Sequence, residues 1–368
     1  MELTREEEAI LRGEEGEGYQ KAMEILVALG KVQGAQKLIP VRSAQISGVS
    51  PMTIGEAGME FLRDWASSGV KARIYATLNP AGVDLKSWRS LGYPAPFVRM
   101  QSRILDAYRA MGIVPSCTCT PYLVGNLPAP GESVAWAESS SVIYANSVLN
   151  ARTNRESGVS ALASALLGRT PYSGLHLDEN RKPTFAVDVT ASMKDMADYA
   201  ALGYAIGKKQ DGVPLFRGLR PGMEELKILG AALAVGPISM FRFGEKKSGL
   251  ETIEFGKADL EEAYAGLNTT DEEPELVCVG CPHASPREMR DLAGMKTKRR
   301  VWAFTARQNK VRIGGKNMKV VCDTCMVVSP LKDLGIEVVG VNSAKAAYYC
   351  AHLSKLRVRF GPLGELLG

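Results

Sequence analysis

The chain lacks any apolar run long enough to cross a membrane. Its longest such run, residues 228–241, contains a proline and is shorter than the roughly 20 residues that a membrane-spanning helix needs. Residues 1–23 are acidic and lack the basic and apolar segments of a secretory signal peptide. We therefore expect a cytoplasmic protein that is not attached to a membrane.

Histidine and cysteine are scarce, at three and seven residues among 368. An odd number of cysteines in a large chain without a signal peptide argues against a disulfide framework, and it leaves metal binding, catalysis or burial as their roles. A strong charge of one sign is also lacking. The net charge of +5 favours small anionic ligands slightly and gives little support for nucleic-acid binding. The cysteines are Cys117, Cys119, Cys278, Cys281, Cys322, Cys325 and Cys350.

The sequence does contain a regular alternation of short apolar runs and segments with helical periodicity. Residues 1–35 predict two helices, and Thr4 with Glu7 forms a capping box at the start of the first. Strands and helices alternate after them, which predicts an α/β fold with mostly parallel sheets. The expected strands lie within 37–51, 71–82, 112–122, 182–190, 274–280, 299–306, 316–328, 336–342 and 355–361. The expected helices lie within 54–69, 102–111, 159–168, 198–210, 223–235, 285–295 and 343–353, and residues 211–222 are rich in turn formers.

Two CxxC pairs occupy equivalent places in this pattern. Cys278 lies inside the apolar run LVCV, and Cys281 lies just past its end. Cys322 and Cys325 repeat the arrangement after the run KVVC. Ligand sites in open α/β sheets gather outside the carboxyl ends of the strands. We therefore expect the second cysteine of each pair to carry chemistry and the first to pack in the core.

The sequence CTC at 117–119 ends another strand candidate, residues 112–122. The Thr-Pro-Tyr that follows Cys119 turns the chain sharply away. By the same rule, Cys119 is expected to be the exposed cysteine of this pair and Cys117 the packed one.

A helix is predicted to begin shortly after Cys281. Ser285 is expected as its N-cap, Pro286 as its first residue and Glu288 as the third. The positive amino end of this helix can stabilise a thiolate or the negative charge of a metal cluster.

Three interpretations of the cysteines remain. Two CxxC pairs indicate a zinc site when about 15–20 residues separate them. Here the segment between Cys281 and Cys322 contains a helix and a strand, which a compact zinc ribbon cannot accommodate. Simple burial of free thiols is the second interpretation. Three thiolates from three strand ends, with a fourth position open, would suit an iron–sulfur cluster whose free iron binds substrate, and this is the interpretation that we favour.

Five long and unusual stretches resemble the large subunit of the aconitase X family, in particular its archaeal members. They are CTCTPYLVGNLP, AESSSVIYANSVLNARTNRESG, GVPLFRGL, VGCPHAS and CDTCMVVSP, and the resemblance covers essentially the whole chain. It implies an aconitase-like fold with three α/β domains around a cleft that contains an iron–sulfur cluster. We expect domains at 1–135, 136–265 and 266–368. The resemblance implies a 4Fe-4S cluster with three cysteine ligands, Cys119, Cys281 and Cys325, while the sequence leaves the number of irons open.

The resemblance also implies the reaction and a partner. The reaction is dehydration of (R)-mevalonate 5-phosphate to trans-anhydromevalonate 5-phosphate, in the archaeal mevalonate pathway of isoprenoid synthesis. Related enzymes need a fourth, swivelling domain, and nothing after residue 361 supplies one. A separate small subunit is therefore expected to carry it, giving a heterodimer, and a serine of that subunit is expected to be the general base.

Side chains for an anionic substrate are expected at three places. The glycine turn at 47–50 offers backbone amides, the strand end at 77–82 offers hydroxyl and amide groups, and residues 138–156 add a carboxylate, hydroxyls and arginines. The candidate substrate-binding residues are Ser47, Gly48, Thr77, Asn79, Glu138, Ser139 and Arg152. His283, two residues from Cys281, is a candidate proton donor, and a hydrogen bond to the backbone at the helix start is its alternative role.

Two other functions stay open at this point. A hydroxyproline dehydratase of the same family would share the cluster and the dehydration chemistry. A zinc-containing nucleic-acid-binding protein would use the CxxC pairs with the basic stretches 296–300 and 307–319. Those stretches lack interleaved aromatic residues, and such runs more often form solvated surfaces. We therefore expect neither a nucleic acid nor a membrane as a partner.

Overall fold

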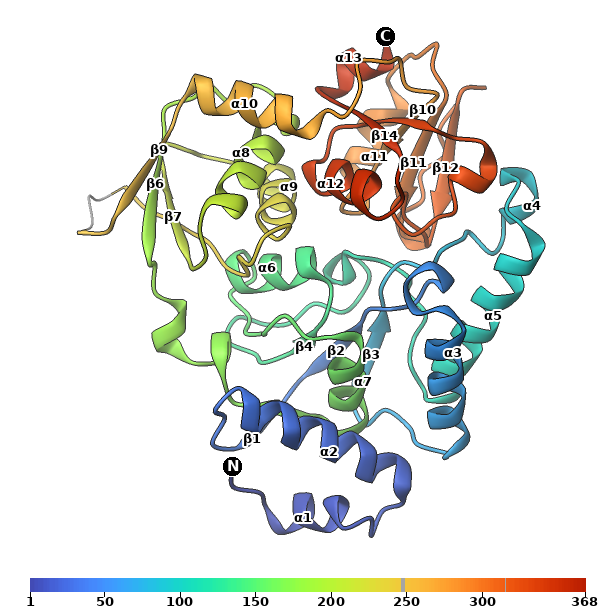
Figure 1. The fold of residues 1–368 in the computed structure, drawn as a ribbon, viewed down its shortest axis with the longest axis vertical. Coiled ribbons are helices and arrows are strands. Elements are labelled where there is room, and N and C mark those ends of the chain that lie inside the picture. Colours follow the sequence, from blue (N-terminus) through green and yellow to red (C-terminus); the bar gives the residue numbers. More distant parts are fainter. Residues whose placement is uncertain (246–248, 315) are drawn as a thin grey trace. The chain divides into compact units, whose positions relative to one another are not determined.

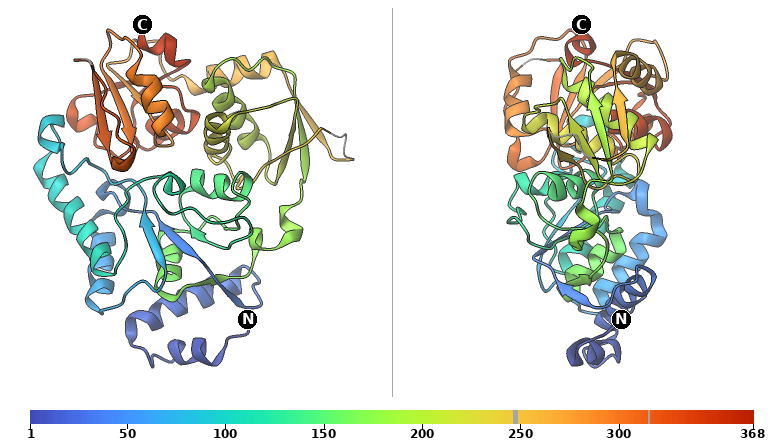
Figure 2. Two further views of the ribbon diagram at one scale, coloured as in Figure 1. Left: turned by 180° about the vertical axis from the view of Figure 1, so that it is seen from behind. Right: turned by 90° about the vertical axis from the view of Figure 1, so that its left-hand side faces the viewer.

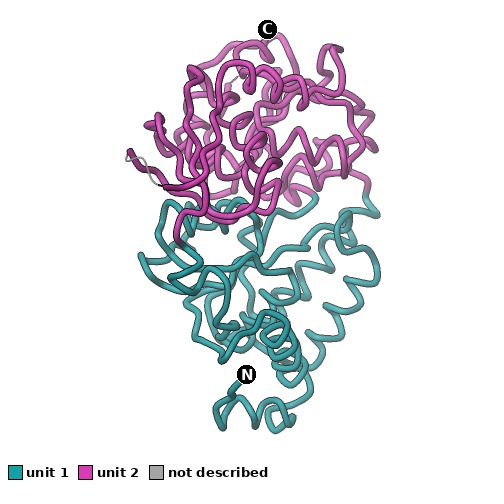
Figure 3. Tube along the Cα trace, turned by 60° about the vertical axis from the view of Figure 1, so that its left-hand side comes forward, with its two compact units in different colours: residues 1–82, 95–181 teal, residues 83–94, 182–368 magenta. Residues whose placement is uncertain are grey.

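The computed structural model describes residues 1–245, 249–314 and 316–368. The chain forms two compact units, and each takes up two separate stretches of sequence (Figure 3). Unit 1 contains residues 1–82 and 95–181, and unit 2 contains residues 83–94 and 182–368. The three-domain division with limits at 135 and 265 stays a prediction.

Unit 1 begins with the two expected helices, α1 (Arg5–Leu11) and α2 (Glu17–Val32) (Figure 1). The predicted capping box is present, because the Thr4 side chain accepts from the Glu7 amide and the Glu7 carboxylate accepts from the Thr4 amide. A short antiparallel pair follows, β1 (Leu38–Pro40) with β5 (Arg169–Pro171).

A parallel three-stranded sheet in the order β3-β2-β4 forms the centre of unit 1. Helix α7 packs on β2 and against α2, and α3 packs against α5. Helix α3 contains a break at Gly55, whose φ of 59° and ψ of −164° are not helical. The strands are β2 (Ser43–Ile46), β3 (Tyr75–Leu78) and β4 (Ala135–Trp136). The helices are α3 (Pro51–Ser67), α5 (Ala95–Ala110), α6 (Ser139–Ser147) and α7 (Gly158–Leu167), with 3-10 turns η1 (Pro121–Leu123), η2 (Gly174–His176) and η3 (Asp178–Arg181).

The prediction of a strand over 112–122 was wrong. Only Val114 forms a bridge, parallel to Thr77, and the chain then leaves the sheet. Cys117 has a φ of 46°, in the left-handed region, which ends the extended conformation. The residues that follow are buried although they form no strand, because the loop lies inside the unit.

A four-stranded parallel sheet in the order β8-β7-β6-β9 forms the first half of unit 2. Helices α8 and α9 pack against each other beside it (Figure 1). Strand β7 lies within residues 211–222, which the turn formers had marked as irregular. The strands are β6 (Phe185–Val189), β7 (Pro214–Arg217), β8 (Arg242–Phe243) and β9 (Thr252–Phe255), and the helices are α8 (Met196–Lys209), α9 (Met223–Leu233) and α10 (Lys257–Leu267).

A five-stranded parallel sheet in the order β12-β11-β10-β13-β14 forms the second half, as the sequence predicted. Strands β11 and β12 extend the sheet on one side of β10, and β13 and β14 extend it on the other side. Right-handed connections therefore place α11 and α12 on opposite faces of the sheet (Figure 2). The strands are β10 (Leu276–Val279), β11 (Val301–Thr305), β12 (Met318–Cys322), β13 (Val338–Val341) and β14 (Arg357–Phe360). The helices are α4 (Trp88–Leu91), α11 (Pro286–Ala293), α12 (Ala344–His352) and α13 (Leu363–Leu367), with 3-10 turns η4 (Arg307–Asn309) and η5 (Lys332–Leu334).

The prediction of a mixed α/β fold with parallel sheets is therefore confirmed. Every residue of β10 and β11 is buried, which explains their continuous apolar runs, and α11 and α13 pack on one face of these strands. In the described part of the chain, every helix falls short of the length and apolarity that spanning a bilayer requires.

His176 is a buried histidine that makes the stability of unit 1 sensitive to acid. Burial, with the charges of Arg181 and Arg152, lowers its pKa from 6.5 to about 4. The unfolded chain binds this proton between those two pH values, so stability falls as the pH drops from about 6.5 towards 4. In urea denaturation, His176→Leu should reduce the loss between pH 7 and pH 4.5 by about 2–3 kcal/mol.

The exposed His352 provides the matched control, because its ring contacts Tyr348 of its own helix, through a hydrogen bond to the carbonyl and by stacking on the ring. His352→Leu should leave the acid dependence as it is in the wild type. An unchanged acid slope in the His176→Leu variant would contradict the assignment.

Candidate functional site

The carboxyl edge of the five-stranded sheet presents the two cysteines that the sequence singled out. Cys281 follows β10 and Cys325 follows β12, and because the strands are parallel both lie at the same edge. Both cysteines are partly exposed, whereas Cys278, Cys322 and Cys350 are buried. The prediction that the first cysteine of each CxxC pair packs in the core is therefore confirmed.

Burial keeps the thiols of Cys278, Cys322 and Cys350 protonated. Burial raises the pKa of Cys322 to about 11 and raises that of Cys278 further. Burial also raises the pKa of Cys350 well above its ordinary value, and the neighbouring Cys278, Cys281 and Cys325 add to the effect. Cys281 and Cys325 thus share a neighbour in Cys350, which places them in one region of unit 2.

Each of the three candidate ligand cysteines follows a residue in the left-handed region. Gly280, just before Cys281, has a φ of 99°, and a Cβ there would lie 2.1 Å from the Phe304 carbonyl oxygen. Cys117 and Asp323, each two residues before a candidate ligand, have φ values of 46° and 65°. Such conformations carry strain in residues other than glycine and gather at functional sites. The other two non-glycine residues of this kind in the described part of the chain, Asn150 and Lys355, are not next to a cysteine.

His283 joins the loops that carry the two cysteines. Its ring is fully buried, and Nε2 lies 2.8 Å from the carbonyl oxygen of Thr324, the residue before Cys325. Nε2 therefore carries the proton and donates to this carbonyl. The geometry matches the alternative of a backbone hydrogen bond, while the role of proton donor in catalysis stays a prediction.

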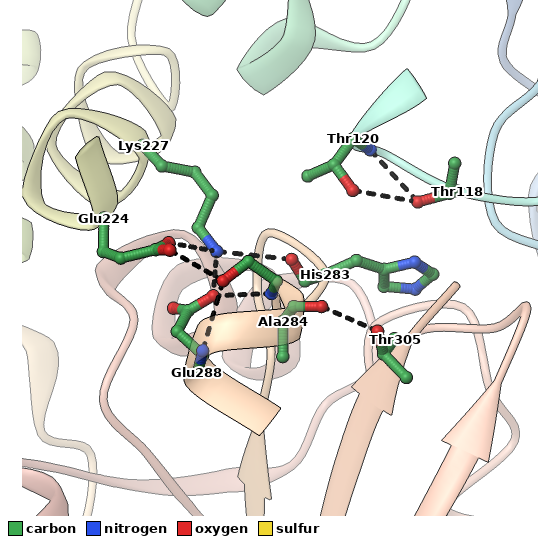
Figure 4. Close-up of polar contacts among 9 residues, drawn as sticks. Thr118, Thr120, Glu224, Lys227, His283, Ala284, Glu288 and Thr305 are labelled. Carbon is green, nitrogen blue, oxygen red and sulfur yellow. Dashed lines mark hydrogen bonds and ion pairs between the residues drawn. The ribbon is translucent and has the colours of Figure 1, made fainter. Parts of the chain in front are cut away.

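The loop after Cys281 rests on a buried ion cluster. Lys227 of α9 forms ion pairs with Glu224 and Glu288, and its Nζ lies 3.3 Å from the carbonyl oxygen of His283 (Figure 4). Ser285 donates from its hydroxyl to Glu224, at 2.7 Å, and from its amide to Glu288, at 2.7 Å. The predicted capping of α11 by Ser285, Pro286 and Glu288 is confirmed.

Burial alone would lower the pKa of Lys227, but the charges of Glu288 and Glu224 outweigh it and raise the pKa above its ordinary value. Burial raises the pKa of Glu288, the more deeply buried of the two carboxylates. The ammonium therefore stays charged, and the cluster joins α9 firmly to the start of α11.

A second charged cluster, which no sequence pattern indicated, lies beside Cys325. Asp84 accepts from Arg307 Nη2 at 2.6 Å and from the Cys322 amide at 3.1 Å, and Arg307 Nε donates to Asp323 at 2.6 Å. Arg307 follows β11, so the strand-end rule that selected the cysteines could also have selected it. Nothing in the sequence near Asp84 indicates a partner that is 238 residues away.

In unit 1, Asn79 and Glu138 meet at the carboxyl edge of the β3-β2-β4 sheet. Asn79 Nδ2 donates to Glu138 Oε2 at 2.7 Å, and the Ser140 hydroxyl donates to Glu138 Oε1 at 3.0 Å. Glu138 is the N-cap of α6, which makes Ser139 the first residue of that helix. The structure thus brings together three of the predicted substrate-binding residues.

Cys119 lies in the same unit, close to the strand ends. The Ser141 hydroxyl of α6 donates to its carbonyl oxygen at 2.6 Å, and Gln45 of β2 donates to the Thr118 carbonyl at 2.9 Å. Cys119 is 8% exposed and Cys117 is 2% exposed, so the expectation of an exposed Cys119 was wrong and both are buried. The loop lies under α6 instead of ending an edge strand.

Two buried amide oxygens at this edge lack a hydrogen-bond partner, Oε1 of Gln45 and Oδ1 of Asn79. The amide orientations follow from their partners, because both amide nitrogens donate to oxygen atoms. A buried polar atom without a partner is costly, and it indicates a place where a ligand or water binds. These oxygens can accept hydrogen bonds from a hydroxyl group.

The remaining predicted residues lie in different surroundings. Ser47 and Gly48, at the end of β2, line a mainly apolar pocket of about 230 Å³ with Phe61 and Leu162. Gly48 has a φ of 78°, which agrees with the predicted glycine turn. Thr77 is fully buried, and its hydroxyl accepts from Asn126 at 2.9 Å, which gives it a structural role.

Arg152 lies at the amino end of β4, away from Glu138 at the carboxyl end. Its backbone pairs with Ser133, and its guanidinium donates to the His176 carbonyl at 2.8 Å and to Asp178 at 2.5 Å. These contacts give the side chain a structural role in unit 1, and substrate binding by Arg152 stays a prediction.

Within neither unit do three His, Cys, Asp or Glu side chains gather as a metal site, among the residues that the structure describes. Cys119 belongs to unit 1, while Cys281 and Cys325 belong to unit 2. The basic stretch 307–319 surrounds Gly315, which lies outside the described residues.

Comparison with sequence families accounts for nearly all of the chain. Residues 1–179 match the aconitase X first domain, residues 183–265 the second domain and residues 274–367 the third domain. The two halves of unit 2, each with its own parallel sheet, correspond to the second and third domains.

Curated relatives match nearly the whole of this chain. The phosphomevalonate dehydratase large subunit of Methanocaldococcus jannaschii is 47% identical, and the match covers 100% of this chain and 99% of the relative. The protein of the same name from Methanothermobacter thermautotrophicus is 46% identical, with coverages of 94% and 93%. The cis-3-hydroxy-L-proline dehydratase of Pseudomonas aeruginosa is 34% identical over 97% of this chain, which spans only 68% of that longer protein.

A solved structure has the same fold. The crystal structure of Thermococcus kodakaraensis aconitase X, in its holo-form, is 42% identical and superimposes with a TM-score of 0.92. The match covers 100% of this chain and 99% of that one. The term holo-form says that the related protein carries a bound cofactor.

Proposed function

We propose that this chain, which belongs to the aconitase X family, is the large subunit of a dehydratase that acts on (R)-mevalonate 5-phosphate. The observation that carries the proposal is the end-to-end match, at 44–47% identity, to four archaeal proteins named phosphomevalonate dehydratase large subunit. The named relatives, including the more distant ones, are all dehydratases, so the enzyme is a hydro-lyase.

The residues present suit an iron–sulfur cluster with three cysteine ligands. Cys281 and Cys325 are partly exposed at one sheet edge on turns of unusual backbone conformation, and Cys119 lies on a turn of the same kind. Thiolates are the ligands that such clusters require. We assign these three residues as the ligands of a 4Fe-4S cluster. When bound, such a cluster supplies a Lewis acid, an iron without a cysteine ligand, for the leaving hydroxyl group.

Residues of unit 2 fix the ligand loops in advance. His283 links the two loops through the Thr324 carbonyl, and Lys227 binds the His283 carbonyl from α9. Both side chains are buried behind the partly exposed cysteines. Fixed ligand loops avoid reorganisation during the reaction, which is a general source of catalytic efficiency.

Residues of unit 1 supply polar groups for the substrate. The two unpartnered amide oxygens, on Gln45 and Asn79, are suited to accept hydrogen bonds from substrate hydroxyl groups. Glu138 is fixed by Asn79 and Ser140, so its carboxylate has a defined orientation at the strand ends. Ser139 is the first residue of α6, and the positive amino end of this helix favours an anionic group nearby.

A small partner subunit is part of the proposal. The archaeal relatives are named large subunits, while the hydroxyproline dehydratases are longer single chains of which this chain spans 68%. We assign a swivel domain to the small subunit and expect a serine of that subunit to remove the proton next to the substrate carboxylate. A positioned base of this kind contributes about 10²–10⁴-fold to the rate.

The experiment is a substrate comparison with the anaerobically reconstituted pair of subunits. Product formation from (R)-mevalonate 5-phosphate and from cis-3-hydroxy-L-proline is followed by mass spectrometry. We expect elimination of water from (R)-mevalonate 5-phosphate. Turnover of cis-3-hydroxy-L-proline should be at least about 10²-fold slower, since this substrate has no phosphate and leaves the phosphate-binding groups of the enzyme unpaired. Turnover of hydroxyproline alone would reassign the chain to the other branch of the family.

A further inference from the structure

Residues 83–94, which we call the arm, belong to unit 2 although the residues on both sides belong to unit 1 (Figure 3). The arm follows β3 and its Asn79, contains the short helix α4 and leads into α5. Its contacts in unit 2 concentrate around one feature, the loop 322–329 that carries Cys325.

Asp84 is the contact at the amino end of the arm. It is 1% exposed, and its two oxygens accept from the Cys322 amide and from Arg307 Nη2. The same carboxylate accepts from the amides of Lys86 and Ser87, at 3.0 and 3.2 Å, which fixes it within the arm. A buried carboxylate with this many donors is fully satisfied and has one orientation.

The Cys322 amide needs this partner because β12 is an edge strand. Among the described residues β12 pairs with β11 alone, and the next amide, that of Asp323, donates to the Thr305 carbonyl of β11. Cys322 is fully buried, so its outward-facing amide has no access to water. Asp84 supplies the acceptor that a further strand would otherwise supply.

Asp323 and Arg307 extend the contact towards Cys325. The left-handed conformation of Asp323 costs energy and persists only where its surroundings impose it. Arg307 imposes it, because its amide and Nε donate to the two Asp323 oxygens at 2.9 and 2.6 Å. Asp84 in turn accepts from Nη2 of the same guanidinium and helps to hold it in place.

Tyr93 is the contact at the carboxyl end of the arm. Its hydroxyl lies 3.1 Å from the Ser329 hydroxyl, which lies 2.9 Å from the Thr324 hydroxyl. The Ser329 amide donates to the Cys325 carbonyl at 3.1 Å. The Tyr93 ring is buried beside Trp302 of β11, with 6.3 Å between ring centroids.

The arm therefore bonds the Cys325 loop on both sides of the cysteine. We propose that residues 83–94 position Cys325 for cluster binding, with Asp84 and Tyr93 as the positioning residues. The proposal rests on the proposed function, since Cys325 is a ligand only if the protein binds a cluster. It assigns a role to a segment that contains no cysteine and no substrate-binding candidate.

The principal test is Asp84→Asn, which keeps the size of the side chain and removes its charge. In the cluster-loaded protein, loss of iron to a chelator should be about 10- to 100-fold faster, as for other residues that orient metal ligands. The electron paramagnetic resonance spectrum of the reduced cluster should change, because the geometry at one ligand changes. In the protein without cluster, hydrogen exchange of the Cys322 amide should be at least about tenfold faster.

Two further variants separate positioning from general destabilisation. Tyr93→Phe removes one hydroxyl group and should give a smaller change of the same kind, without affecting the Cys322 amide. Asp106→Asn, on the exposed surface of α5, makes the same chemical change at a carboxylate that pairs only with Arg109. It should leave iron release, the spectrum and hydrogen exchange unchanged.

The outcomes distinguish this proposal from the proposed function. If the wild-type protein binds no iron after anaerobic reconstitution, the proposed function is wrong. In that case, unchanged hydrogen exchange over residues 320–329 in the Asp84→Asn variant would also overturn the proposed role of the arm. If the wild type binds a cluster and the variant matches it in iron release, spectrum and exchange, only the arm proposal is overturned.

Discussion

Replacing Cys281, Cys325 or Cys119 with alanine should abolish the cluster and lower the rate of dehydration at least about 10³-fold. The proposed Lewis acid is worth several kcal/mol of transition-state stabilisation, and each 1.36 kcal/mol is a factor of ten in rate. Iron and sulfide analysis after anaerobic purification measures the cluster directly, and the visible spectrum reports on it independently of activity.

Cys278→Ala and Cys322→Ala are the matched controls, because each removes the partner cysteine of a CxxC pair. Both thiols are buried in strands, so these variants should keep the iron and lose about 1–2 kcal/mol of stability from the cavity left behind. A colourless wild-type protein with stoichiometric zinc, bound by all four CxxC cysteines, would refute the assignment.

Lys227→Met should destabilise unit 2 by about 3–5 kcal/mol, because it leaves the largely buried Glu224 and Glu288 carboxylates, each less than one fifth exposed, without a compensating charge. Urea denaturation followed by circular dichroism measures the change. The same variant removes the ammonium that binds the His283 carbonyl, so the loop that carries Cys281 should also exchange its amide hydrogens faster.

The double variant Lys227→Met with Glu288→Gln should recover part of this loss, because one of the uncompensated charges is removed. The control is Lys257→Met, which breaks an exposed pair with Glu261 in α10 and should change stability little. A Lys227→Met protein as stable as the wild type would show that the buried charges are not coupled.

The strand-end rule succeeded in unit 2 because its signals are local. The apolar run around Cys278 is continuous because β10 is buried along its whole length, and the run KVVC reaches full burial at Val321 and Cys322 of β12. The helix after Cys281 was equally predictable, because Ser285 and Glu288 make the capping contacts within four residues of each other. Short-range patterns of this kind depend on neighbours in the sequence alone.

The placement of strands from local composition failed in two places where distant parts of the chain decide the conformation. Residues 112–122 have the composition of a strand, but the left-handed Cys117 and the burial of the loop under α6 take them out of the sheet. Strand β7 was hidden by the glycines and prolines around it, although Phe216 is fully buried. Burial of that ring compensates for unfavourable local composition.

The sequence by itself thus determined the α/β class, the family and which cysteine of each CxxC pair faces the carboxyl edge of the sheet. The tertiary structure alone decided what surrounds those cysteines: His283 bonding across to Thr324, Lys227 beneath the first loop and Asp84 beside the second. The physical reason is that a buried charge is stable only with a partner. Such partners come from segments far apart in the sequence, where no local pattern records the pairing.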